Sequence, residues 1–444
     1  MALFPTTARL RIVFSIALPM MGGMVSQVLL NLVDTAMVGT LGPTSLAAVG
    51  IGSYATFMAT AAVMGLGSGV QALAARRIGE QRADEAAVPL NGGLITAIAA
   101  GAPISIALWA FTPELLALLN PDPALVAEGT PYLRARMIAV VAVGMNFSFR
   151  GYWAGVSLTR YYMQTLIIMH LCNVSLNYAL IFGHFGAPAL GAEGAGLATS
   201  ISLYIGTTIY MFLAFRHGRG HGFLRAIPSA ANMKILLKLS LPTALQQFLF
   251  AAGFTALFWI VGRISADAVA VSHVLTTFIL VALLPGMAFG IAIMTRVSEA
   301  LGRNDAEDAS RWGWQGVAII CVVMGTIALP GVVIPEILLS GFIHDPAIRE
   351  MGAGALRLVA AGLIVDAVTS SLMNSLLGAG ATRQVMFVSV SSQWLLGLPL
   401  AWLTSVYWGY GLIACWACFI GYRAVQAAAF AILWSRGDWK TIKI

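Results

Sequence analysis

Two carboxylates lie deep inside long apolar stretches of this chain. Asp34 is near the far end of an apolar run that begins around Leu10, and Asp366 lies within another run, LIVDAV. A charge at membrane depth costs at least ~2.5–3.5 kcal/mol, so an acid there usually faces a protein cavity and has a role. We expect Asp34 to hold and release a proton or small cation. For Asp366 we expect a second coupling site, a substrate-facing anion, or an acid paired with a polar group.

Neutral polar side chains recur at helical spacing near Asp34. Gln27 precedes it by seven residues, and Asn173 and Asn177 are four residues apart, so each pair shares one helix face. Thr199 could add a hydroxyl. One carboxylate with several neutral oxygens accepts a proton and could also coordinate Na⁺. The structural alternative is that these groups only join helix to helix, each hydrogen bond contributing roughly 0.6 kcal/mol.

Other polar or helix-bending residues occupy the apolar stretches as well. His170 and His273 either relay protons or are satisfied structural histidines, and the sequence does not decide between the two. Arg423 either faces the interior of a bundle or extends to the cytoplasmic rim. Pro19 removes one backbone donor from the helix that carries Asp34, which favours a bend there.

Apolar stretches of membrane-spanning length recur along the whole chain. Of its 444 residues 59% are hydrophobic and 10% charged, and the mean hydropathy is +0.86. A helix needs about 20 apolar residues to cross a bilayer. We therefore predict an all-α polytopic membrane protein whose first helix is retained rather than cleaved as a signal peptide. The twelve predicted spans are residues 10–40, 45–75, 88–112, 128–155, 161–184, 193–215, 234–262, 267–300, 312–334, 351–378, 384–406 and 409–435.

Basic residues are distributed unequally between the predicted loops. With both termini in the cytoplasm, 19 of the 25 Lys and Arg residues fall on that side and 5 on the other, Arg134 and Arg136 among them; Arg423 lies inside a span. This positive-inside bias fixes the orientation. The net charge of +7 therefore reflects topology rather than nucleic-acid binding.

The second half of the chain repeats the first at a shift of 223 residues. Matched pairs include Pro19 and Pro242, Gly67 and Gly290, Asp122 and Asp345, and Gly155 and Gly378. The two deep acids break the repeat, because Asp34 falls on Leu257 and Asp366 on Val143. Each half holds six spans, so we expect the halves to be related by a pseudo-twofold axis along the membrane normal.

The repeat also predicts how the chain divides. We predict an N-terminal six-helix lobe at 1–215, a flexible cytoplasmic linker at 216–230 in a Gly-rich polar stretch, and a C-terminal six-helix lobe at 231–444. Two such bundles around a central cleft are typical of carriers that alternate between inward-open and outward-open states.

Sequence motifs for enzymatic chemistry are missing. There is no G-x-x-x-x-G-K-[ST] loop for ATP. Cys415 and Cys418 form a CxxC within an apolar helix, and the sequence offers no second ligand pair, so we expect no metal site. We predict a protein that is not an enzyme, has no catalytic residues and needs no cofactor beyond a coupling ion, H⁺ or Na⁺.

Three segments resemble signatures of the multidrug and toxic compound extrusion (MATE) family. Residues 31–39 (NLVDTAMVG), with 46–50 (LAAVG), resemble its first-helix signature. Residues 173–178 (NVSLNY) resemble its span-five motif, and residues 194–199 (GAGLAT) are similar to the start of its sixth span. The similarity extends over essentially the whole chain, the six-plus-six repeat included.

The resemblance implies a secondary antiporter that expels cationic, amphipathic drugs in exchange for H⁺ or Na⁺. By motif position it assigns ion coupling to Asp34, with Gln27, Asn173, Asn177 and Thr199 as neighbours and Pro19 as the bend point. Span seven lacks the acid that the NorM-like branch uses in its second lobe, whereas Asp366 matches the acidic position of span ten. We therefore expect a DinF-like member with proton coupling in its N-terminal lobe.

Our expectation is a proton-coupled multidrug antiporter of a bacterial inner membrane, with both termini cytoplasmic, functional as a monomer. Protonation of Asp34 from outside would rearrange the first helix and release the substrate. One alternative is a Na⁺-coupled multidrug antiporter. Another is a flippase for lipid-linked precursors within the same superfamily, which the mainly acidic deep charges disfavour. A channel or scaffold is a third.

Overall fold

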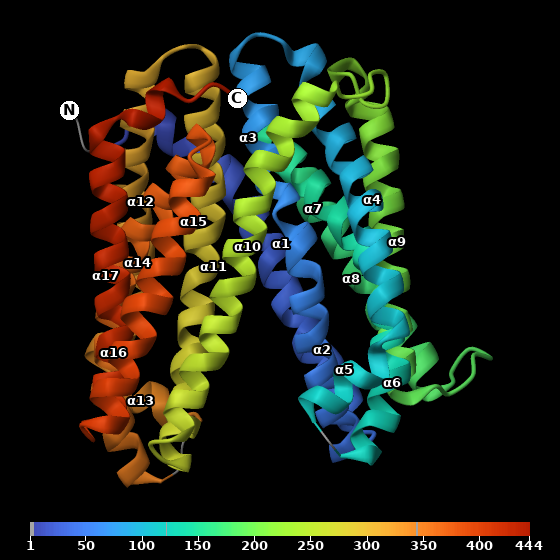
Figure 1. The fold of residues 1–444 in the computed structure, drawn as a ribbon, viewed down its shortest axis with the longest axis vertical. Coiled ribbons are helices and arrows are strands. Elements are labelled where there is room, and N and C mark those ends of the chain that lie inside the picture. The colour runs from blue at the N-terminus through green and yellow to red at the C-terminus, as the bar shows by residue number, and fades with distance from the viewer. Residues whose placement is uncertain (1–3, 121, 343–344) are drawn as a thin grey trace. The chain divides into compact units, whose positions relative to one another are not determined.

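The computed structural model describes residues 4–120, 122–342 and 345–444, which fold into helices without a strand among them (Figure 1). Within these residues, eleven helical segments are long and apolar enough to cross a membrane. They are Thr7–Gly39, Pro43–Gly79, Ala83–Ala110, Thr159–Phe182, Gly191–His217, Ala230–Gly262, Ala266–Gly302, Ala306–Val333, Pro346–Ala379, Thr382–Tyr407 and Gly411–Arg436. The prediction of an all-α membrane protein is confirmed, and these segments match eleven of the twelve predicted spans.

The remaining predicted span, 128–155, forms two shorter helices, α6 (Pro123–Met137) and α7 (Val140–Gly155). The backbone carbonyls freed at the interruption would be costly in a bilayer without donors. Three hydroxyls on neighbouring helices supply them. Ser105 donates to the Met137 carbonyl at 2.6 Å, Ser200 to that of Ala135 at 2.7 Å, and Tyr204 to that of Ile138 at 2.8 Å.

The chain forms two compact units, and both limits between them fall inside a long helix, α1 (Thr7–Gly39) or α10 (Ala230–Gly262). The N-terminal unit is Pro19–Ala244, and the C-terminal unit combines the residues up to Leu18 with Leu245–Ile444. These limits differ from those of the predicted lobes: they fall inside helices, next to Pro19 and close to Pro242.

The helices lying wholly within each unit follow the predicted repeat. The N-terminal unit contains α2 (Pro43–Met64), α3 (Leu66–Gly79), α4 (Val88–Ala110), α5 (Thr112–Leu119), α6, α7, α8 (Thr159–Phe182) and α9 (Gly191–His217). The C-terminal unit contains α11 (Ala266–Gly302), α12 (Ala306–Val333), α13 (Pro335–Ser340), α14 (Pro346–Ala379), α15 (Thr382–Ser391), α16 (Leu398–Trp402) and α17 (Gly411–Arg436).

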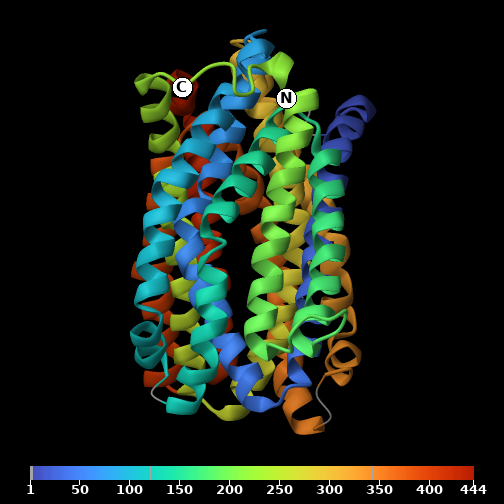
Figure 2. The same cartoon turned by 90° about the vertical axis from the view of Figure 1, so that its right-hand side faces the viewer.

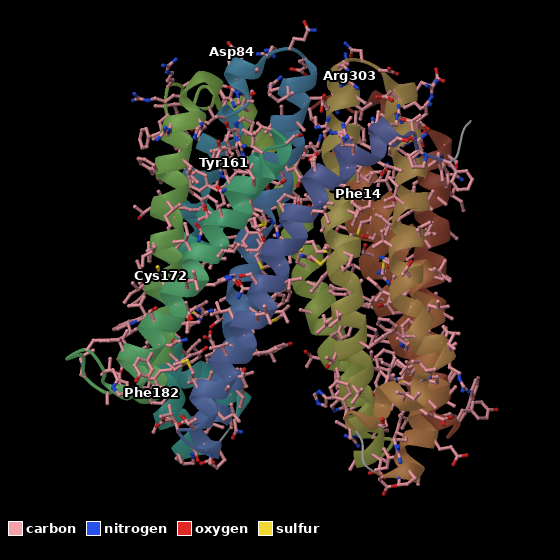
Figure 3. All side chains as sticks on the ribbon, turned by 180° about the vertical axis from the view of Figure 1, so that it is seen from behind. Phe14, Asp84, Tyr161, Cys172, Phe182 and Arg303 are labelled. Atoms are coloured by element: carbon pink, nitrogen blue, oxygen red, sulfur yellow. The ribbon has the colours of Figure 1, made fainter. Side chains whose placement is uncertain are left out.

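The start of α1 belongs to the C-terminal unit because its side chains pack there. Arg9 pairs with Asp308, donates to Gln315 at 2.7 Å, and stacks over the Trp312 ring at 4.4 Å. Phe14, labelled in Figure 3, meets Phe289 edge-on with ring centroids 5.0 Å apart. This short stretch therefore has polar and aromatic anchors of its own.

Matched glycines allow the same close helix approach in both units. A Cβ at Gly155 of α7 would lie 2.9 Å from the Gln71 carbonyl oxygen of α3. A Cβ at Gly378 of α14 would lie 2.6 Å from the Met294 carbonyl oxygen of α11. Both members of these two contacts are related by the shift of 223 residues. The sequence repeat is therefore a repeat of tertiary packing.

The predicted linker, 216–230, is tied down within the N-terminal unit. The buried amide of Asn91 on α4 donates to the carbonyls of Gly222 and Ala226 at 3.1 and 3.0 Å. Its own oxygen accepts from the Leu224 backbone at 3.1 Å. His221 is bonded to the Tyr152 hydroxyl at 2.8 Å. Hydrogen bonds therefore hold this Gly-rich segment against α4 and α7 of the N-terminal unit.

Candidate ion-coupling site

Asp34 is held by an amide of a neighbouring helix. It lies on α1 five residues before the end of the helix and is partly exposed. Its carboxylate accepts a hydrogen bond from Asn177 of α8 at 2.6 Å. The Asn177 amide is fully buried and also donates to Asn173 at 2.9 Å. The sequence-predicted pair of asparagines therefore does face the sequence-predicted acid.

The network continues from α8 to α9, which run side by side as the two green helices in Figure 2. Asn173 donates to the Ser202 hydroxyl at 3.2 Å, and Ser202 donates to the Thr199 carbonyl at 2.8 Å. The Thr199 hydroxyl itself turns back to the Ala195 carbonyl of its own helix at 2.9 Å. Thr199 thus takes part in the network through its backbone carbonyl. The hydroxyl expected from Thr199 is supplied by Ser202.

Gln27 belongs to a second polar cluster, which lies between α1 and α8. Its amide donates to Asn31 at 3.1 Å, and its oxygen lies 3.2 Å from Nε2 of His170. The other ring nitrogen of His170 lies 2.6 Å from the Ser26 hydroxyl. His170, Asn173 and Asn177 share one face of α8. The histidine therefore binds α1 through both nitrogens, two helical turns from Asp34.

This arrangement makes the contact between α1 and α8 sensitive to the charge of one group. An ionised carboxylate only accepts hydrogen bonds, and a bond from a neutral amide to it is roughly twice as strong as a neutral bond. When Asp34 gains a proton, the bond from Asn177 loses its charge assistance. A proton on Asp34 would therefore weaken its hydrogen bond to Asn177, which joins α1 to α8.

Arg136 is the residue near this site that the sequence did not reveal. Its guanidinium, on the last turn of α6, is near enough to act electrostatically on Asp34. The count of basic residues places it with Arg134 on the outer side of the membrane. The sequence signal is the spacing: Arg134 and Arg136 project about 200° apart around one helix, so they meet different neighbours. Arg134 stacks over Trp109 at 4.8 Å.

Asp366 in the C-terminal unit has a different environment. It is 6% exposed on α14 and forms an ion pair with Arg423 of α17. Arg423 also donates to Gln426 at 2.7 Å. Of the three roles expected for Asp366, the geometry matches an acid paired with a polar group. Of the two positions expected for Arg423, it matches the one facing the interior of its unit. Breaking such a buried pair leaves an uncompensated charge.

The other predicted residues are not part of either cluster. Pro19 lies inside α1 at the limit between the two compact units. His273 is exposed on α11 and lies beside the Phe258 ring at 4.9 Å. Across the part of the chain that the structure describes, no three His, Cys, Asp or Glu residues gather closely enough to hold a metal ion.

The fold and the site together define a helical membrane protein with two repeated units, one of which holds a carboxylate bonded to a neutral amide. The family model MatE matches residues 19–179 and 242–403, so its two matches also start 223 residues apart. The chain belongs to the MATE family. Members of this family are transporters, and the chain is accordingly a transporter and not an enzyme.

Relatives and solved structures agree over nearly the full length. The chain is 26% identical to a probable multidrug resistance protein NorM of Thermotoga maritima, covering 96% of this chain and 92% of that protein. It is 28% identical to a probable NorM of Mesorhizobium japonicum, covering 97% and 94%. A structure titled as the outward-facing conformation of a multidrug resistance MATE family transporter matches with a TM-score of 0.88 at 21% identity, covering 97% and 96%, which supports the fold.

Proposed function

We propose that this transporter is a secondary antiporter that extrudes cationic, amphipathic drugs from a bacterial cytoplasm in exchange for protons. The names of its relatives, multidrug resistance proteins of bacteria, support the substrate class. The positive-inside bias supports an inner-membrane protein with both termini in the cytoplasm. One chain supplies both repeated units, which supports function as a monomer.

The observation that carries the proton-coupled mechanism is the bond between Asp34 and Asn177. Asp34 is half-buried and has a neutral amide as its hydrogen-bond partner. Such a carboxylate can hold either a proton or the positive charge of a drug. When the proton and the drug compete for this one carboxylate, each lowers the affinity of the site for the other by the same factor. Protonation from outside then releases the drug, and proton loss to the cytoplasm resets the site.

The state of Asp366 supports coupling through the N-terminal unit alone, as expected of a DinF-like member. Asp366 is in a direct, buried ion pair with Arg423, which a proton or Na⁺ would have to break, whereas Asp34 is bonded to a neutral amide. The same pair also leaves less basic charge available for the pyrophosphate of a lipid-linked precursor, which weighs against the flippase alternative.

The test is drug efflux in proteoliposomes with proton and sodium gradients imposed separately. Ethidium is the reporter, and protein with Asp34→Asn is the control. We expect a proton gradient to drive uphill ethidium transport and a sodium gradient at constant pH to drive none. Transport driven by neither gradient, or by a proton gradient equally well in Asp34→Asn, would reject the proposal.

Sodium coupling is the second candidate, and one feature favours it. The Oδ1 oxygen of Asn177 is buried next to the Asp34 carboxylate with no hydrogen-bond partner among the described residues. Carboxylate and amide oxygens are ligands that hard cations accept. If the sodium gradient alone drives ethidium efflux in the same vesicles, the coupling ion is Na⁺ and the role of Asp34 is cation ligation.

A further inference from the structure

Arg136 lies deep in the N-terminal unit with unused hydrogen-bonding capacity. It is thirteen residues past the start of α6, which is about 20 Å along the helix. Its Nε and Nη1 atoms are buried and have no hydrogen-bond partner in the described part of the chain. An ionisable side chain at such depth is costly and usually has a function. A buried donor left unpaired adds a further penalty.

The complementary unpaired acceptor lies at the coupling site. Asn177 Oδ1 is buried and unpaired, and the Asp34 carboxylate beside it accepts from Asn177. Arg136 lies beside this network, because Ala135 before it accepts a hydrogen bond from Ser200 of α9. On the same helix, Ser202 accepts from Asn173, which accepts from Asn177. The positive charge of Arg136 acts on the Asp34 carboxylate. Two buried guanidinium donors and one buried amide oxygen are therefore unpaired in the same region, beside an acid that could also accept. One rearrangement of a long, flexible side chain would satisfy all of these atoms.

Four titratable groups around Arg136 already have hydrogen-bond partners. On α6, Glu128 accepts from Ser45 and the Tyr132 hydroxyl is bonded to Ser53. On α9, the Tyr204 hydroxyl donates to the Ile138 carbonyl, and on α8 both nitrogens of His170 contact α1. The remaining titratable side chains on helices packed against α6 are Tyr54 of α2, Glu114 of α5, and Glu193, Tyr210, Arg216 and His217 of α9.

We propose that Arg136 is a built-in cation of the coupling site, whose guanidinium binds Asp34 and Asn177 when neither a proton nor a drug is there. This inference rests on the proposed exchange at Asp34 and adds a third competitor to it. The empty, ionised site is then closed by an internal ion pair rather than left as a bare buried charge. An arriving proton or organic cation displaces Arg136, and the returning guanidinium helps to expel the drug.

The test compares Arg136→Gln with Arg134→Gln in lipid nanodiscs, using tetraphenylphosphonium as the probe. Arg134 is the matched control because it lies two residues away on the same helix and stacks on Trp109. Removing the competing charge should tighten binding by about tenfold at a pH where Asp34 is ionised. The pH at which half of the binding is lost should rise by about one unit, since tenfold corresponds to one pH unit. Arg136→Lys, which keeps the charge, should stay close to wild type.

Two further measurements keep the inference separable from the proposed function. In an Asp34→Asn background, Arg136→Gln should no longer change binding, because coupling vanishes when one partner is absent. Arg136→Met serves as a second variant if the glutamine protein does not fold. Unchanged or weaker binding in folded Arg136→Gln or Arg136→Met protein would overturn the inference. If Asp34→Asn keeps wild-type pH-dependent binding, the proposed function fails first, whatever Arg136 does.

Discussion

The two deep acids of this transporter differ in the charge of their partners. Asp34 in the N-terminal unit is partly exposed and receives one hydrogen bond from a neutral amide. Asp366 in the C-terminal unit is 6% exposed and paired with Arg423. The units repeat each other closely enough to share glycine contacts at one fixed shift. The two repeated units therefore differ in electrostatics: the acid of one is bonded to a neutral amide, and the acid of the other is in a direct ion pair.

The largest expected difference is in transport. Asp34→Asn should reduce proton-driven ethidium efflux by about 100-fold, the upper part of the usual range for coupling between two ligands. Asp366→Asn, in the fraction that folds, should keep the dependence on the proton gradient. Efflux from proteoliposomes with matched protein content measures both. Equal losses in the two variants would remove the functional distinction between the acids.

The second expected difference is in stability. Asp366→Asn should destabilise the protein by ~3–5 kcal/mol because it leaves Arg423 buried without its counter-charge. The double variant Asp366→Leu with Arg423→Met should recover most of that loss, since apolar replacement of a buried pair is often neutral. Thermal unfolding in detergent compares the variants. A double variant as unstable as the single one would mean that the pair contributes something other than charge balance.

A smaller effect is expected from the amide that holds Asp34. Asn177→Ala removes a hydrogen bond to a charged group, which typically contributes ~1.5–3 kcal/mol. We expect the pH midpoint of tetraphenylphosphonium binding to shift while efflux persists at a reduced rate. Ser175→Ala is the control, because Ser175 lies on the same helix, exposed, with its hydroxyl bonded to its own helix. An unshifted midpoint would argue against control of Asp34 by Asn177.

The smallest effect separates the pH dependence of stability from that of transport. Burial lowers the pKa of His221, in the turn after α9, below its usual value. As pH falls below that usual value, the unfolded chain takes up the proton more readily than the folded one, so stability decreases. His221→Gln should flatten the decline of the melting temperature between about pH 7 and 5. Its efflux-versus-pH profile should match wild type; a shifted profile would assign His221 a part in coupling.

The sequence predicted the helices well because their signal is length and apolarity, which the bilayer imposes directly. It also predicted that Asn177 faces Asp34, since spacing of four residues places Asn173 and Asn177 on one face of α8. Arg136 and Arg423 were harder, because position along a span indicates depth but not which neighbour a side chain meets. Thr199 was misjudged in detail: its hydroxyl bonds to the carbonyl four residues earlier, a local competitor that helical threonines always have.

The central claim, that one carboxylate exchanges a proton for a cationic drug, is tested most directly by counting protons. Tetraphenylphosphonium is added to purified protein in weakly buffered solution, and the released protons are measured. We predict about one proton released per bound cation near the pH midpoint of binding, as reciprocal linkage at one site requires, and none from Asp34→Asn. Release that persists in Asp34→Asn and disappears in the Asp366→Leu, Arg423→Met double variant would contradict the account.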